Sequence, residues 1–146
     1  MQYEYFSTDK DRFSLHDCTA TAVKLTDGKL IFYLPDGFFY EHSSNAWCNT
    51  GEAEIEFAIN SIRDVTLDLF VESEGRTFRN AYTAEHLIEK INNKEWELEF
   101  AYRYDGYEEI LYKCWIWEQR GPETYEGELW IRTKEKTVFR WNPPKE

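Results

Sequence analysis

The chain has 146 residues, 42% of them hydrophobic and 18% aromatic, and its 28 acidic and 17 basic residues give a formal charge of −11. This length suits a single domain over residues 1–146 with an aromatic core, and the composition excludes a disordered chain. The negative charge repels phosphate backbones and anionic lipid headgroups, so neither nucleic acid nor a membrane is an expected partner, whereas a basic protein is compatible with it.

The N-terminal residues lack the basic start and the apolar core of a signal peptide, and no run approaches the ~20 apolar residues of a membrane span. Cys18, Cys48 and Cys114 are widely spaced and form no C-x-x-C pair, which indicates neither a disulfide framework nor a zinc site. We therefore expect a cytoplasmic protein with reduced cysteines.

The first predicted elements are an edge strand and a β-hairpin. Residues 2–6 alternate aromatic and polar side chains at the start of the chain. Further on, Asp27 and Gly28 separate two alternating runs, and this dipeptide tolerates the positive φ angles of a type I′ turn. Symmetric pairing about the turn sets Val23 opposite Phe32, on a face that we expect to be buried.

A second Asp-Gly pair, at residues 36–37, predicts another turn. The aromatic run after it indicates a third strand that ends by His42. Residues 43–51 are rich in Ser, Asn, Thr and Gly, which is typical of a loop. Trp47 lies within this loop, so it must either fold back onto the core or face a partner.

Two alternating runs follow, at residues 54–59 and 65–71. The first places Ile55, Phe57 and Ile59 on one face, and the second does the same with its Val and Leu side chains. The connection over residues 60–64 is short, so we predict that the two runs are neighbouring antiparallel strands.

One helix is predicted, beginning after the N-cap Thr83. Its apolar residues Ala84, Leu87, Ile88 and Ile91 follow the i, i+3, i+4, i+7 pattern. Since this pattern forms a single apolar stripe, the helix should lie on a sheet.

The longest predicted hairpin joins residues 95–104 to residues 107–117 through the Asp-Gly pair at 105–106. Symmetric pairing about that turn sets Trp96 opposite Trp115 and Phe100 opposite Leu111. Both faces of the second strand are largely apolar, so we expect it to be central and covered on both sides.

A last hairpin is predicted from residues 125–132 and 137–141, joined across residues 133–136. The total is about nine or ten strands and one short helix. We predict a mainly β fold, at the margin of α+β: a curved antiparallel sheet, a sandwich or an incomplete barrel.

The residue types nearest to a catalytic arrangement are His16, Asp17 and Cys18. A carboxylate could orient the imidazole, which could activate the thiol as a nucleophile. Neighbours in an extended chain point to opposite faces, however, so Asp17 does not share a side with His16 and Cys18. The other interpretation is a turn in which Asp17 binds backbone N–H groups and His16 is partly buried.

The run Phe13-Ser14-Leu15-His16-Asp17-Cys18, followed by a strand, an Asp-Gly turn and a second strand, resembles the F-H-D openings of small bacterial β-rich proteins. These include uncharacterised families and polymorphic-toxin immunity proteins. The resemblance implies a non-catalytic bacterial protein that acts by binding another protein, and the acidic charge would suit a basic toxin.

We expect no cofactor and no metal site, because the spacing of the three histidines matches no metal motif. One alternative function is a carbohydrate or small-ligand binding module that uses exposed tryptophans. A homodimer is a further alternative, through a β-edge such as residues 137–141. The residues that we expect to contact a partner or ligand are His16, Asp17, His42, Trp47 and Trp117.

Overall fold

The computed structural model describes residues 1–7, 12–43 and 46–145. These residues are mostly β: 63% of them lie in strands, and they form one α-helix and three antiparallel sheets, none closed into a barrel, which confirms the predicted fold class. Helix α1 spans Ala84–Asn92, and a short 3₁₀ helix, η1, spans Ile62–Asp64. The strands of the described residues are β1 (Tyr3–Ser7), β2 (Phe13–Ser14), β3 (Cys18–Ala20), β4 (Ala22–Thr26), β5 (Lys29–Leu34), β6 (Phe39–Ser43), β7 (Ala46–Asn49), β8 (Ala53–Ala58), β9 (Val65–Ser73), β10 (Arg76–Thr83), β11 (Trp96–Gly106), β12 (Glu109–Glu118), β13 (Thr124–Arg132) and β14 (Thr137–Trp141).

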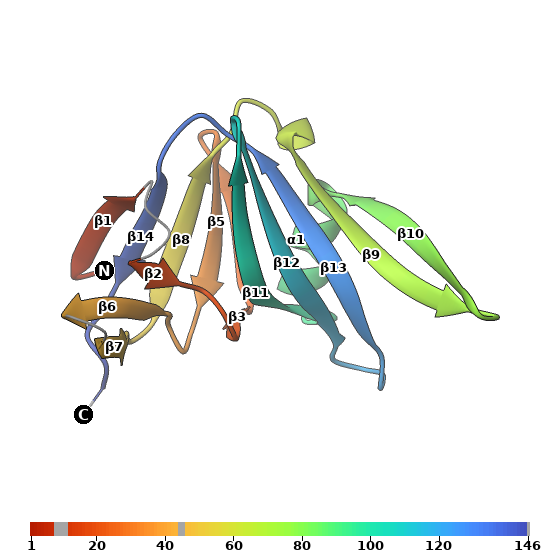
Figure 1. Cartoon of the computed structure of the whole chain (residues 1–146), viewed down its shortest axis with the longest axis horizontal. Helices are drawn as coiled ribbons and strands as arrows, with labels where there is room; N and C mark the ends of the chain where they lie inside the picture. Colours follow the sequence, from red (N-terminus) through yellow and green to blue (C-terminus); the bar gives the residue numbers. More distant parts are fainter. Residues whose placement is uncertain (8–11, 44–45, 146) are drawn as a thin grey trace.

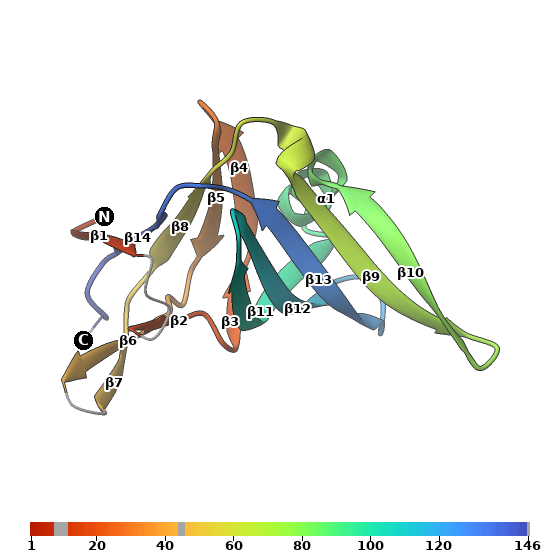
Figure 2. The same cartoon turned by 45° about the horizontal axis from the view of Figure 1, so that its top comes forward.

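Two large sheets face each other across the core (Figure 1). The five-stranded sheet has the order β1-β14-β8-β5-β4, and the six-stranded sheet has the order β10-β9-β13-β12-β11-β3. A small sheet, β2-β6-β7, lies near the lower ends of β8 and β14 in Figure 1. Helix α1 contacts β4 of one large sheet and β9, β10 and β11 of the other, and Figure 2 shows it beside β4 and β10.

The hairpin of β4 and β5 confirms the first predicted pairing. Val23 lies opposite Phe32, and both side chains are buried. Asp27 and Gly28 have φ angles of 51° and 72°, which are the positive values that a type I′ turn requires. The edge strand expected at the start of the chain is β1, which pairs with β14 at the end of the five-stranded order.

The two large sheets are joined where the chain passes from β3 into β4. Strand β3 pairs with β11 of the six-stranded sheet, whereas β4 pairs with β5 of the five-stranded sheet. Only Thr21 separates them, and its N–H donates to the Tyr33 carbonyl over 3.0 Å. One continuous stretch therefore changes sheets at this corner, as strands do at the corners of packed sheets.

Two predicted strand pairings are wrong, because each joins strands of different sheets. Strand β8 pairs with β5 and β14, and the chain then crosses through η1 to β9 in the six-stranded sheet. Likewise, β13 pairs with β12 and β9, whereas β14 pairs with β8 and β1. Strand alternation shows which face is buried, but two strands that bury their faces from opposite sheets show the same pattern. The expected free edge at residues 137–141 is also wrong, since β14 lies between β1 and β8.

The hairpin of β11 and β12 exists, but its predicted register is wrong. The turn is at Tyr107 and Glu108, where Glu108 has a φ of 52°, and Gly106 already pairs with Glu109. Trp96 therefore lies opposite Glu118 rather than Trp115, and Phe100 lies opposite Cys114 rather than Leu111.

Strand β12 is central, as predicted, but it is covered on one face only. Its inner residues, such as Tyr112 and Ile116, are buried. Its outer face carries Trp115 and Trp117, which are 39% and 45% exposed. The apolar residues of this outer face had suggested burial, yet no described element packs on them.

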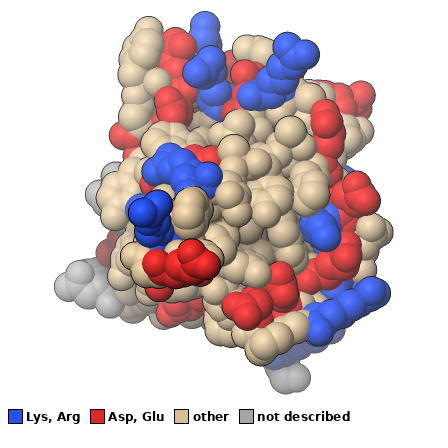
Figure 3. All heavy atoms as spheres, turned by 90° about the vertical axis from the view of Figure 1, so that its right-hand side faces the viewer, with Lys and Arg blue, Asp and Glu red and all other residues tan. Residues whose placement is uncertain are grey.

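Two further strands lie where sequence reasoning had placed none. Residues 46–49 form β7, which pairs with β6, so the predicted loop over residues 43–51 is wrong in that part, while residues 44–45 lie outside the described residues. Strand β10 follows a turn at Glu74 and Gly75, which have φ angles of 51° and 76°. It forms an edge of the six-stranded sheet, and Figure 3, from the β10 side, shows acidic and basic groups interspersed there.

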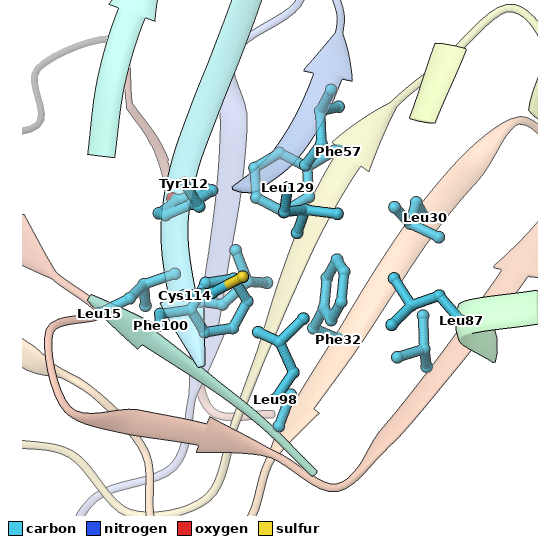
Figure 4. Close-up of a cluster of buried hydrophobic side chains, with 14 of the residues drawn as sticks. Leu15, Leu30, Phe32, Phe57, Leu87, Leu98, Phe100, Tyr112, Cys114 and Leu129 are labelled. Carbon is cyan, nitrogen blue, oxygen red and sulfur yellow. The ribbon is translucent and has the colours of Figure 1, made fainter. Parts of the chain in front are cut away.

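The core combines aliphatic and aromatic side chains from both large sheets (Figure 4). Aliphatic residues are the more numerous among the buried side chains, so the expectation of a mainly aromatic core is wrong. Phe32 of the five-stranded sheet packs edge-on against Phe100 of the six-stranded sheet, with ring centroids 5.4 Å apart. Phe57 and Tyr112 pack the same way at 6.0 Å. Helix α1 adds Leu87, which is fully buried, and the Thr83 side chain accepts a hydrogen bond from the backbone of the first turn, as predicted for the N-cap.

Candidate ligand cleft

A cleft of about 600 Å³ opens between the small sheet and the middle of β11. Its walls come from β2 and the turn after it, from β6 and β7, from β11 and β12, and from β14. Its lining includes the polar residues Ser14, His16, Asp17 and Arg103, and the Ser14 hydroxyl accepts from the His16 backbone N–H. The rest of the lining is mainly aromatic: Phe13, Phe39, Trp47, Tyr102, Tyr112 and Phe139.

His16 and Asp17 reach the cleft on a tight turn from Leu15 to Cys18. The Cys18 N–H donates to the Leu15 carbonyl over 2.9 Å, and Asp17 has a φ of 64°, which is the left-handed position of a type II turn. The Asp17 N–H donates to the Phe100 carbonyl over 2.9 Å, so the turn is fixed to β11. The predicted turn is therefore present, but among the described residues no backbone N–H donates to the Asp17 carboxylate. The expectation that Asp17 and His16 point to opposite sides is wrong, because the turn brings both side chains to the cleft.

The imidazole of His16 is held in one orientation. Its Nδ1 lies 2.9 Å from the Ala101 carbonyl oxygen, which only accepts, so Nδ1 carries the proton of the neutral ring. Nε2 lies 3.5 Å from Asp17 Oδ1, and the ring packs against Tyr102 with centroids 4.8 Å apart. With 44% of the side chain exposed, Nε2 is the ring nitrogen available for a further contact.

A β-bulge in β11 brings Arg103 to the cleft. Between the pairs Phe100–Cys114 and Arg103–Tyr112, β11 has one residue more than β12. The extra residue shifts the alternation, so that Arg103 lies opposite the inward-facing Tyr112 while Tyr102 is 58% exposed. Strict alternation would have buried Tyr102 and placed Arg103 on the outer face.

Arg103 is a mostly buried cation in the wall of the cleft, held by its neighbours. Its Nε and Nη2 donate to the Asp105 carboxylate, at 3.1 Å and 2.9 Å from Oδ1, and its Nη1 donates to the Tyr112 hydroxyl over 3.2 Å. Burial by itself would lower the pKa of Arg103, but the contacts with Tyr112 and Asp105 outweigh it and leave this pKa raised. Burial raises the pKa of Tyr112, so its hydroxyl stays protonated.

The thiol of Cys18 is not activated by its neighbours. Burial, and then the charge of Asp17, raises its pKa to about 12, and the Sγ–H donates to the His16 carbonyl rather than to the imidazole. A thiol with this pKa is protonated at neutral pH and is a poor nucleophile. This geometry does not favour the alternative of thiol catalysis by His16, Asp17 and Cys18.

The structure brings three of the five expected contact residues to this cleft. His16, Asp17 and Trp47 line it, and Trp47 is 49% exposed at its mouth. His42 is exposed on β6, where its ring lies 6.2 Å from that of Tyr40, and it does not line the cleft. Trp117 lies on the outer face of the six-stranded sheet.

Sequence reasoning missed Arg103 and Tyr112 as cleft residues. Both lie in strands that were predicted, but the bulge that turns Arg103 inward has no distinct sequence signature. The shift in register explains the omission of Tyr112, because its position opposite Arg103 depends on the true turn at residues 107–108. No signal in the alternation of β11 would have identified the pair.

The comparisons with known proteins identify no relative: no family model, no curated protein and no solved structure matches the chain. Within the described residues, no three or more His, Cys, Asp and Glu side chains are grouped to hold a metal ion. No helix in residues 1–7, 12–43 and 46–145 is long and apolar enough to cross a membrane.

Proposed function

We propose that this chain is a non-catalytic binding protein whose cleft takes a small ligand with a flat, apolar body. The observation that carries the proposal is the cleft itself, with about 600 Å³ between aromatic walls and polar side chains that include those of His16, Asp17 and Arg103. Ligand sites in proteins are commonly of this size and composition.

The three cysteines are free, which supports the further proposal of a reducing, cytoplasmic setting.

The polar groups define what the ligand should carry. At the rim, His16 Nε2 and the 70% exposed Asp17 carboxylate both accept hydrogen bonds, which favours a donor on the ligand. The mostly buried Arg103 donates, which favours an acceptor on the part of the ligand near it. The exposed rings of Trp47 and Tyr102 provide flat surfaces for the body of the ligand between these polar groups.

The test is a titration of the ¹⁵N-labelled protein with a panel of aromatic fragments and aryl glycosides, followed by NMR. We expect the amide signals of residues 13–17 and 101–103 and the Trp47 indole signal to shift together. Trp47→Ala should weaken the best fragment about tenfold, because stacking on one ring contributes roughly 1.4 kcal/mol.

Trp117→Ala is the matched control, because it removes a tryptophan of similar exposure that does not line the cleft. It should leave the affinity unchanged. A panel in which no fragment shifts the cleft signals would overturn the proposal, as would equal losses of affinity in the two variants.

A further inference from the structure

We propose that the outer face of the six-stranded sheet docks a basic protein partner by taking its arginine or lysine side chains onto Trp115 and Trp117. This proposal is independent of the ligand cleft, since the two sites share no residue. We call the surface the tryptophan face and define it by these outward-facing residues: Phe70, Glu97, Glu99, Trp115, Trp117 and Glu126.

Carboxylates flank the exposed rings of the tryptophan face. Trp115 lies directly between Glu99 of β11 and Glu126 of β13, and Trp117 lies opposite Glu97. Directly opposed residues of neighbouring antiparallel strands have Cα atoms roughly 4.5–5.5 Å apart. A cation above the Trp115 ring would therefore be within reach of a carboxylate on each side.

The same row of the sheet already holds cations of the chain in this way. Phe70 lies opposite Glu126, and the Arg79 guanidinium lies 4.9 Å from the centre of the Phe70 ring. Arg79 also pairs with the carboxylates of Asp68 and Glu128, each at 3.0 Å. On this face, an aromatic ring with carboxylates beside it thus already binds a cation of the chain.

At the two tryptophans, the cation is missing. Within the described residues, no lysine or arginine lies over the ring of Trp115 or Trp117. In that same part of the chain, the carboxylates of Glu97, Glu99 and Glu126 have no ion-pair partner. An arginine or lysine from a partner would supply the charge that these groups lack.

On other surfaces of the molecule, several charged groups pair with one another. On the outer face of the five-stranded sheet, Arg140 pairs with Glu56 at 2.8 Å and with Glu4 at 2.6 Å. The β10 side carries groups of both signs (Figure 3). The formal charge of −11 steers a basic partner toward the molecule, and the unpaired acids beside exposed tryptophans select the tryptophan face.

The probe is a short peptide of alternating arginine and glycine, titrated at low salt into the ¹⁵N-labelled full chain. A second peptide with citrulline in place of arginine keeps the shape and removes the charge. We expect the arginine peptide to shift the indole signals of Trp115 and Trp117 and the citrulline peptide to leave them unchanged. Trp115→Ala should weaken binding of the arginine peptide about two- to fivefold.

Two variants that each remove one negative charge separate local binding from general attraction. Glu126→Gln removes a carboxylate beside Trp115 and should weaken the peptide about threefold. Glu54→Gln removes one from the outer face of the five-stranded sheet and should leave the affinity unchanged. Equal effects of the two, unchanged binding to Trp115→Ala, or equal binding of the citrulline peptide would each overturn the proposal.

Discussion

The side chain of Asn92 closes an edge of the five-stranded sheet, and its removal should weaken the fold measurably. Its Nδ2 donates to the Val23 carbonyl over 2.7 Å, and its Oδ1 accepts from the Val23 N–H over 3.0 Å. The amide thus replaces a neighbouring strand at β4, where helix α1 ends. Without it, two partly buried backbone groups of the edge lose their partners.

The expected cost of Asn92→Ala follows from these two hydrogen bonds. Each contributes about 1 kcal/mol, and the better helix propensity of alanine returns roughly 0.5 kcal/mol. The net loss is therefore about 1.5 kcal/mol in the free energy of unfolding, or roughly 3–6 °C in the melting temperature for a domain of this size. An unprotected edge also favours pairing between molecules.

Urea unfolding followed by tryptophan fluorescence measures this loss, with Asn93→Ala as the matched control. Asn93 follows directly in the chain and makes no such side-chain contact with β4 among the described residues. Its replacement should change the unfolding free energy by less than about 0.5 kcal/mol. The reasoning fails if the two variants lose equal stability, or if hydrogen exchange at the Val23 amide is the same in Asn92→Ala as in the unmodified protein.

Three further predictions concern the core, the thiols and acid stability. Phe32→Ala should cost about 3–5 kcal/mol in urea unfolding, because the fully buried ring contacts both sheets. Iodoacetamide at pH 8 should modify the partly exposed Cys48 well before the buried Cys18, whose pKa of about 12 leaves little thiolate. Peptide mass spectrometry measures the rate of alkylation at each cysteine. The hydrogen bond from Tyr33 holds the pKa of Glu52 below 4.5. Glu52→Ala should therefore lower the urea midpoint of unfolding near neutral pH. This difference between the variant and the unmodified protein should disappear as the pH falls below 4.5.

Each of these has an outcome that would contradict it. A loss below about 1 kcal/mol in Phe32→Ala would mean that the sheets do not pack on this ring. Equal alkylation of Cys18 and Cys48 in the folded protein would contradict the burial of the former. A difference between Glu52→Ala and the unmodified protein that grows in acid would contradict the sign of the pKa shift.

Local signals in the sequence predicted the parts of the fold that depend on neighbouring residues. The Asp27-Gly28 turn set the register of β4 and β5 because both residues adopt positive φ in a turn of fixed length. The N-cap Thr83 and the apolar stripe located α1 for the same reason. The turn predicted at the Asp-Gly pair 105–106 is wrong, because Gly106 still belongs to β11 and the turn follows it.

Long-range features were not predictable from alternation. The crossings from β8 to β9 and from β13 to β14 depend on which sheet completes the core, and a hairpin shows the same sequence pattern as a crossing. Of the cleft, the turn with His16 and Asp17 was recognised from local chemistry. Arg103 was not recognised, because the direction of its side chain depends on the bulge in β11, which arises where β11 pairs with β12.

The most direct test of the account is a crystal structure of the protein with the tightest fragment from the NMR panel. We predict density for the fragment between Trp47 and Tyr102, with an acceptor atom within hydrogen-bond distance of Arg103 and a donor near His16 Nε2. Density on the outer face of β12, or none in the cleft at a concentration that saturates the NMR shifts, would contradict the assignment of this cleft as the binding site.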